Sequence, residues 1–210
     1  MSNATIDTIK HSPGFTIIEL LVSMTISLVV LAAVAKTFTV QTRQNSAEEQ
    51  MAQMQQNVRG ALDLMVREIQ MAKYDPAGTA FPAGTYGITY SASQLEVKSD
   101  VADSNGTIST ATGSVEDIIY AFDSTNFYIT RTLGSSGTAD IVADNITSFT
   151  FAYYDANGTA VTSAGNSGSI RKVIIIIVAR TAKPDPGYTT NSGYRTYQVT
   201  ADITPPNLAL

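Results

Sequence analysis

The longest apolar stretch of the sequence runs from Phe15 to Ala35, and it limits what the N-terminal part of the chain can fold into. The stretch holds 21 residues and a single charge, Glu19. An α-helix rises about 1.5 Å per residue, so this stretch would measure roughly 31 Å, close to the thickness of a bilayer's hydrocarbon core. We therefore predict a membrane-spanning helix. A charged side chain inside such a span is costly and indicates a functional residue.

Two ordinary explanations of this stretch compete with a functional one. A cleaved secretory signal has an apolar region of about 7–15 residues followed by a small-residue cleavage site. The present run is longer, although Ala32-Ala33-Val34-Ala35 imitates such a site and keeps this explanation open. A plain single-span anchor accounts for the length, but it accounts neither for Glu19 nor for the Gly14-Phe15-Thr16 that opens the span.

The start of the stretch carries a recognisable motif. Gly14-Phe15-Thr16-Ile17-Ile18-Glu19-Leu20 resembles the class III signal of type IV pilins and type II secretion pseudopilins, whose pattern is G-[FM]-[ST]-L-[IL]-E. The resemblance implies that residues 1–14 are a cleaved leader peptide. It also implies that a prepilin peptidase cuts between Gly14 and Phe15 and that the new amino group of Phe15 is methylated. In this family Glu19 would pair with the N-terminal amine of a neighbouring subunit, since a carboxylate in hydrocarbon needs a partner.

Composition argues against several classes of function. The 210-residue chain has a net charge of −5 and no basic run, which disfavours nucleic-acid binding. It has no Cys, so disulfides and thiolate metal sites are excluded. Its single His, His11, lies in the leader, which argues against His-cluster metal sites and Ser-His catalysis. We expect no enzyme activity, no cofactor and no bound metal.

Helical periodicity continues beyond the apolar stretch to about Lys73. Residues 36–73 contain no Pro, and Pro76 predicts the end of the helix because it disfavours helical backbone at the residue before it. We interpret Gly60 as a bend or a point of close packing. Apolar residues spaced three or four apart form one stripe along this helix: Met51, Met54, Val58, Leu62, Met65, Ile69 and Ala72. This stripe is either a coiled-coil seam or, more simply, a face for the chain's own sheet.

After Gly78 the apolar pattern changes to the period of two that is typical of strands. Within 145–154 we expect Thr147, Phe149, Phe151 and Tyr153 to share one face, and the apolar run in 171–180 suits a strand buried on both faces. Residues 99–114, 155–169 and 184–193 are predicted loops. The predicted strands are residues 86–91, 94–98, 117–122, 127–132, 145–154, 171–180 and 194–203.

These elements together predict an α+β fold. Its long N-terminal α-helix spans the membrane with the first half and packs on an antiparallel β-sheet, as in pilins. A second resemblance covers residues 61–76, 144–155 and 170–173, which are similar to PilW-type minor pilins and their J-type pseudopilin relatives. The predicted domains are the leader 1–14, the transmembrane or filament-core helix 15–35, the amphipathic helix 36–73 and the periplasmic β-rich domain 74–210.

Acidic residues in the loops are the remaining candidates for chemistry. Asp155-Ala156-Asn157-Gly158 resembles the start of a calcium loop, but no Glu completes it, and an ordinary turn is the simpler interpretation. We interpret Asp100, Asp103 and Asn105 as part of a solvated loop. Glu116 and Asp117 are neighbours in sequence, and neighbours in a strand point to opposite faces, so we do not expect a catalytic pair.

The resemblances imply a minor type IV pilin, a structural subunit that helps to prime pilus assembly and is incorporated into the filament. The implied partners are other minor and major pilins through helix–helix contacts, the prepilin peptidase, the inner-membrane assembly platform and membrane lipid before assembly. The implied location is the bacterial cytoplasmic membrane, with one span and a periplasmic C-terminal domain, and then the pilus at the cell surface. The alternatives are a J-type minor pseudopilin of type II secretion and, more remotely, a membrane-anchored periplasmic enzyme or binding module.

Overall fold

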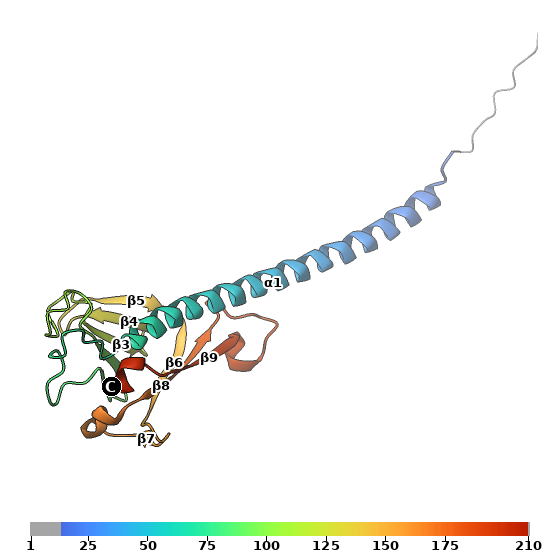
Figure 1. The fold of residues 1–210 in the computed structure, drawn as a ribbon. Helices are drawn as coiled ribbons and strands as arrows, with labels where there is room; N and C mark the ends of the chain where they lie inside the picture. Colours follow the sequence, from blue (N-terminus) through green and yellow to red (C-terminus); the bar gives the residue numbers. More distant parts are fainter. Residues whose placement is uncertain (1–13, 210) are drawn as a thin grey trace, which may run out of the picture. The chain divides into compact units, whose positions relative to one another are not determined.

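The structure of the protein is a computed structural model and describes residues 14–209. This part of the chain contains one long α-helix, nine β-strands and three 3-10 helices (Figure 1). The chain divides into two compact units, the N-terminal unit Met1–Ala47 and the C-terminal unit Glu48–Leu210. Residues 1–13 of the predicted leader lie outside the described residues.

Helix α1 runs from Ile17 to Gln70 without interruption, which confirms the predicted long helix. It stops three residues short of Lys73, its predicted end. Its last turn tightens, because the N–H of Met71 donates to Glu68 O (3.1 Å) and that of Ala72 donates to Ile69 O (3.0 Å). Lys73 then takes a left-handed backbone with φ of +60°, and its N–H donates to Lys98 O at 2.9 Å. The chain thus leaves the helix before Pro76 is reached.

The apolar stripe of α1 belongs to the chain's own core, as the simpler interpretation predicted. Helices with an apolar face of this kind bury it against a neighbouring layer. Gly60 does not mark close packing: it is exposed, and a Cβ added there would meet no atom within 4 Å. The buried residues of the helix are Met54, Val58, Ala61, Leu62, Met65 and Ile69.

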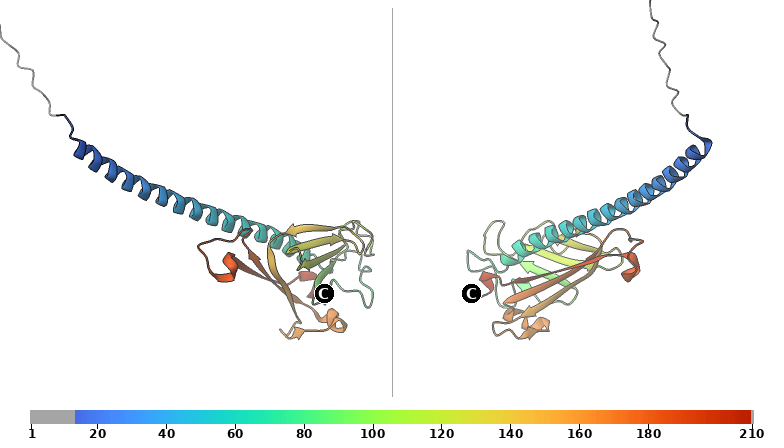
Figure 2. Two further views of the ribbon diagram at one scale, coloured as in Figure 1. Left: turned by 180° about the vertical axis from the view of Figure 1, so that it is seen from behind. Right: turned by 90° about the vertical axis from the view of Figure 1, so that its right-hand side faces the viewer.

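The strands of the C-terminal unit form two antiparallel sheets rather than the single sheet that was predicted (Figure 2). The first sheet is a five-stranded meander in the order β1-β2-β3-β4-β5, and the second is four-stranded in the order β7-β6-β8-β9. The first sheet contains β1 (Ile88–Thr89), β2 (Gln94–Lys98), β3 (Asp117–Asp123), β4 (Tyr128–Leu133) and β5 (Ala139–Ala143). The second contains β6 (Ile146–Tyr154), β7 (Ala160–Val161), β8 (Lys172–Arg180) and β9 (Thr196–Ile203). The 3-10 helices are Ala164–Ser169, Thr190–Gly193 and Pro206–Ala209.

One hydrophobic core joins the C-terminal part of α1 to both sheets. Buried residues of the helix, of the first sheet and of the second sheet belong to a single contiguous cluster. A side chain also links the sheets directly, since the hydroxyl of Tyr153 in β6 donates to Ser91 O beside β2, at 3.1 Å. Burial of the Tyr153 hydroxyl raises its pKa above the ordinary value for tyrosine. The α+β fold class is therefore confirmed, with two sheets sharing one core.

Several local predictions require correction. β8 alternates between buried and half-buried residues, so only the face with Val173, Ile175, Ile177 and Ala179 is fully buried. In β6 a register irregularity between Ile146 and Ser148 leaves Thr147 exposed instead of on the face of Phe149. Such a bulge adds one residue to a strand and reverses the alternation beyond it. The predicted loop 155–169 contains β7 and a 3-10 helix, and β5 was not predicted.

Candidate processing and assembly segment

The helix of the N-terminal unit exposes its apolar side chains. Every residue from 14 to 46 is exposed, and the exposed fraction reaches 85% for Phe15 and 71% for Phe38. The most apolar 18-residue window has a mean hydropathy of 2.5, and none of it is buried. Each CH₂ group that leaves water contributes about 0.8 kcal/mol, so this surface favours contact with lipid or with other apolar helices. By length and composition the helix can cross a membrane.

The hydroxyl groups on this helix bond within the helix itself. Thr25 Oγ1 donates to Leu21 O at 2.7 Å and Ser27 Oγ donates to Ser23 O at 2.7 Å. Ser23, Thr37, Thr39 and Thr42 make the same kind of bond to the preceding turn. Polar groups in hydrocarbon need an internal partner, because no water is available there. These side chains therefore suit an apolar environment despite their hydroxyls.

Thr16 and Glu19 close the N-terminus of α1 with reciprocal hydrogen bonds. The N–H of Glu19 donates to Thr16 Oγ1 at 3.3 Å, and the N–H of Thr16 donates to Glu19 Oε2 at 3.1 Å. The hydroxyl of Thr16 also donates to the same oxygen at 3.0 Å. This arrangement is a capping box, in which Thr at the N-cap and Glu three residues later satisfy two free helix donors. The carboxylate also lies at the positive end of the helix dipole.

The capping box gives Glu19 a local partner that our interpretation of the sequence missed. The resemblance implies a neighbouring subunit as the partner of Glu19, but the spacing Thr-x-x-Glu before an apolar run already indicates a helix start. Gly14 and Phe15 precede the helix and are both exposed. Their roles in cleavage and methylation, and that of Glu19 in assembly, stay predictions.

In the C-terminal unit an ion pair fastens α1 to the first sheet. Arg131 in β4 donates from Nη2 to Glu68 Oε1 at 2.5 Å and from Nε to both carboxylate oxygens, at 3.1 and 3.2 Å. The hydroxyl of Tyr120 in β3 donates to Glu68 Oε2. Burial raises the pKa of Tyr120 well above its ordinary value, so the hydroxyl stays a donor. A bidentate, largely buried ion pair of this kind fixes the position of the helix on the sheet.

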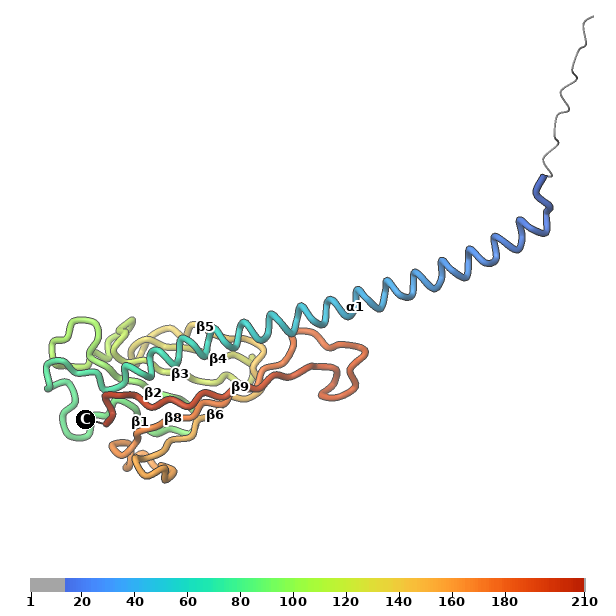
Figure 3. The backbone as a smooth tube through the Cα atoms, turned by 45° about the vertical axis from the view of Figure 1, so that its right-hand side comes forward, coloured from blue at the N-terminus to red at the C-terminus, as the bar shows by residue number. Residues whose placement is uncertain are grey.

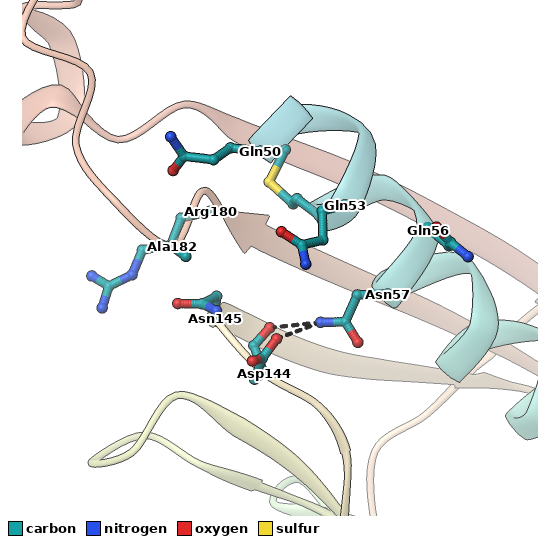
Figure 4. Close-up of a pocket in the computed structure, with 9 residues that line it drawn as sticks. Gln50, Gln53, Gln56, Asn57, Asp144, Asn145, Arg180 and Ala182 are labelled. Carbon is teal, nitrogen blue, oxygen red and sulfur yellow. Dashed lines mark hydrogen bonds between the residues drawn. The ribbon is translucent and has the colours of Figure 1, made fainter. Parts of the chain in front are cut away.

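A pocket of about 540 Å³ lies beside an earlier part of the helix, residues 50–57 (Figure 4). Its single carboxylate, Asp144, accepts hydrogen bonds from Asn57 Nδ2 through Oδ1 at 2.6 Å and through its main-chain oxygen at 3.2 Å. Its one cation, Arg180, stacks on Phe127 and Tyr194, with 4.0 and 4.7 Å to the ring centroids. The other lining residues are Gln50, Gln53, Met54, Gln56, Asn145 and Ala182. The lining is rich in amides: its carboxylate is hydrogen-bonded by Asn57, and its guanidinium stacks on two rings while the buried Nε has no hydrogen-bond partner among the described residues.

The acidic residues of the loops fall into two kinds. Asp155 is part of a turn, as predicted, because its Oδ1 accepts the N–H groups of Asn157 and Thr159, both at 2.8 Å. The interpretation of Asp100 as a solvated residue is wrong: its side chain is buried, whereas Asp103 is exposed. The Asp100 carboxylate turns inward because it accepts the N–H of Gly106, at 2.9 Å.

Glu116 and Asp117 are both buried but face different surroundings, so they form no catalytic pair. Glu116 bonds the loop that precedes β3, through the N–H groups of Ala102 and Ser109. Asp117 accepts the hydroxyl of Ser135 at 3.1 Å, and burial raises the pKa of its carboxyl.

Comparison with known proteins identifies the N-terminal segment. Residues 9–35 match a family model described as the prokaryotic N-terminal methylation motif, which confirms the resemblance to the class III signal of prokaryotic pilins. The exposed apolar helix and this motif together indicate that the N-terminal segment anchors the chain in a membrane. The PilW-type resemblance stays a prediction.

Among solved structures the chain is similar to a type IV-like pilin from Thermus thermophilus. The two share 11% sequence identity with a TM-score of 0.43, over 73% of this chain and 97% of that one. A search of the curated proteins gave no match.

Proposed function

We propose that this chain is a minor type IV pilin, a structural subunit that helps to prime pilus assembly and enters the filament. One observation carries the proposal: the methylation motif of residues 9–35 includes the start of α1, residues 17–35, where every apolar side chain is exposed and the first turn holds Glu19. A prepilin peptidase would cleave between Gly14 and Phe15, and the new amine of Phe15 would be methylated. The mature chain would then begin two residues before the helix.

The apolar helix would serve in two environments in turn. Before assembly the span from Phe15 to Ala35 would lie in the cytoplasmic membrane, with the β-rich domain in the periplasm. In the filament the same side chains would pack against the helices of other minor and major pilins. Lipid tails and apolar side chains are about equally apolar, so this exchange of partners costs little free energy and depends on close packing. The internally bonded hydroxyls of Thr25 and Ser27 fit either environment.

Glu19 would set the register between neighbouring subunits. The capping box uses the N–H and the hydroxyl of Thr16, so it does not depend on Gly14 and would survive cleavage. Both bonds that Glu19 accepts in the box use Oε2, which leaves Oε1 for the methylated amine of a neighbour. The box would therefore hold the carboxylate in position for a charged partner, and the pair would remove an uncompensated charge from the filament core.

The test compares Glu19→Ala with Thr16→Ala in cells that make pili. We expect both variants to reach the membrane fraction, because the apolar span is intact in each. Glu19→Ala should be depleted from sheared pili, whereas Thr16→Ala keeps the carboxylate and should be incorporated much better. Equal incorporation of Glu19→Ala and the unaltered chain would contradict the register role, and equal defects in both variants would assign Glu19 to helix capping alone.

A gene deletion distinguishes a type IV pilus subunit from a subunit of a type II secretion pseudopilus. Deletion of the gene for this chain should reduce surface pili and leave the secretion of exported enzymes intact. Normal piliation with lost secretion would instead assign the chain to the pseudopilus, as a J-type subunit.

A further inference from the structure

Three carboxylates converge in the connection between β2 and β3. One oxygen from each of Asp100, Asp103 and Glu116 lies within 4.8 Å of the other two. Figure 3 traces this connection, residues 99–116, in green between the two strands. Two of the three side chains are in the interior, since Asp100 is 0% and Glu116 is 1% exposed. Like charges at this distance repel one another, and burial strengthens the repulsion.

Main-chain N–H groups of this connection donate hydrogen bonds to Asp100 and Glu116. The N–H of Gly106 donates to Asp100 Oδ2 at 2.9 Å. The N–H groups of Ala102 and Ser109 donate to the two oxygens of Glu116, at 3.1 and 2.8 Å. Gly106 has a φ of +80°, and a Cβ there would lie 2.1 Å from Thr79 Oγ1, so this close turn requires glycine. The backbone is thus arranged to hold the carboxylates together.

These hydrogen bonds leave the negative charge of the cluster without a cation. Asp100 Oδ1 is buried and has no hydrogen-bond partner in the part of the chain that the structure describes. The ion pairs among the described residues are Lys98–Glu96, Arg131–Glu68, Lys172–Asp202 and Arg195–Asp185, and none of them includes the cluster. Buried charges are normally paired or bound to a metal, because an unpaired charge in the interior is costly.

We propose that Asp100, Asp103 and Glu116 bind one calcium ion. Calcium lies about 2.3–2.6 Å from its oxygen ligands, so two oxygens on one ion are at most about 5 Å apart, as the three carboxylates are. Hard oxygen donors and an irregular loop suit calcium, which tolerates flexible coordination, whereas magnesium requires a near-ideal octahedron. Zinc prefers nitrogen and sulfur ligands, which this cluster lacks. The proposal replaces our expectation of no bound metal.

Asn105 fixes the position of Asp103, the exposed member of the cluster, through two hydrogen bonds. Asn105 Nδ2 donates to Asp103 Oδ2 at 2.7 Å, and the N–H of Asn105 donates to Asp103 Oδ1 at 3.3 Å. Calcium would join this exposed carboxylate to the buried Asp100 and Glu116. The ion would therefore tie residues 99–116 to the core of the C-terminal unit and order this surface. The inference rests on this loop alone and is independent of the proposed function.

The test uses the full chain, purified in detergent and freed of metal by a chelator. Calorimetric titration with CaCl₂ should show one ion per chain, and thermal unfolding should shift to higher temperature in calcium than in EDTA. Asp103→Asn should weaken calcium binding at least about tenfold, because ligand charge sets affinity. This variant should fold, since Asp103 is exposed. Its matched control is Asp123→Asn, the same change at the last residue of β3, which should bind calcium unchanged.

Three results would overturn the inference. The first is no saturable calcium binding together with identical unfolding temperatures in calcium and EDTA. The second is equal calcium affinity in Asp103→Asn and the unaltered chain. The third is an equal response to MgCl₂ at the same concentration, which would contradict the assignment to calcium. Circular dichroism of both variants should match that of the unaltered chain, so that a change in binding is read from folded protein.

Discussion

Helix α1 runs through two regions with the same secondary structure and opposite surfaces. Residues 17–46 in the N-terminal unit are all exposed, and their apolar side chains surround the helix. From Met54 to Ile69, in the C-terminal unit, the apolar side chains form a single stripe that is buried. A helix that is apolar all round needs an apolar environment, whereas an amphipathic helix needs only one covered face. The first region therefore needs an apolar environment, such as lipid or other apolar helices, and the second is completed by the chain's own sheets.

Two of the four glutamates of α1, Glu19 and Glu68, repeat this contrast. Among the described residues, Glu19 accepts side-chain hydrogen bonds from Thr16, three residues earlier, and it is exposed. Glu68 binds Arg131 and Tyr120 on the first sheet and is largely removed from solvent. A change at Glu68 should therefore alter the stability of the fold, and a change at Glu19 should alter association.

The largest effect should come from one substitution made in both regions. Met65→Ala removes a side chain that is 0% exposed and should lower the free energy of unfolding by about 2–5 kcal/mol, because it leaves a cavity. Met24→Ala, at a residue that is 64% exposed, should change it by less than about 0.5 kcal/mol. Denaturant unfolding of the C-terminal unit in detergent, followed by tyrosine fluorescence, measures both. Equal effects would break the distinction between the two regions.

A smaller effect should follow from neutralising the glutamate that faces the sheet. Glu68→Gln leaves the guanidinium of Arg131 half-buried without its counter-charge and should cost about 2 kcal/mol of unfolding free energy. Tyr120→Phe removes one hydrogen bond to the same carboxylate and should cost about 1 kcal/mol. Glu19→Gln is the matched control and should leave denaturant unfolding unchanged. If Glu68→Gln had no effect, the ion pair would not fasten the helix.

The smallest effect concerns the glycine of the amphipathic region. Gly60→Ala adds a methyl group where no atom lies within 4 Å, in the interior of a helix. Alanine is favoured over glycine in helices, so the variant should be more stable by about 1 kcal/mol in the same unfolding measurement. A loss of stability would contradict the open space around Gly60 and assign this glycine a packing role within the chain.

The sequence predicted the elements that rest on strong periodicity. The helix stripe, β2 and the β3–β4 hairpin were found because alternating or three-to-four spacing dictates which side chains are buried. The short edge strand β5 was missed, since three of its five residues are exposed and carry no alternation. The division into two sheets depends on long-range pairing, which periodicity does not encode.

The candidate sites were predictable to different degrees. Gly14, Phe15 and Glu19 stand out because they form a contiguous motif, and the Thr16–Glu19 spacing also contained the capping box. The burial of Asp100 and Glu116 was not predictable. Acidic residues in a polar loop are normally solvated, and only the folded main chain brings these two together with Asp103.

The central claim is that this chain is a processed filament subunit. Intact mass and N-terminal peptide mapping of the protein from its own membranes, with and without the prepilin peptidase, test it most directly. We predict a mature chain that begins at a methylated Phe15 and is lost when the peptidase is absent. An uncut chain that begins at Met1 in the presence of the peptidase, or a cut near Ala35, would contradict the account.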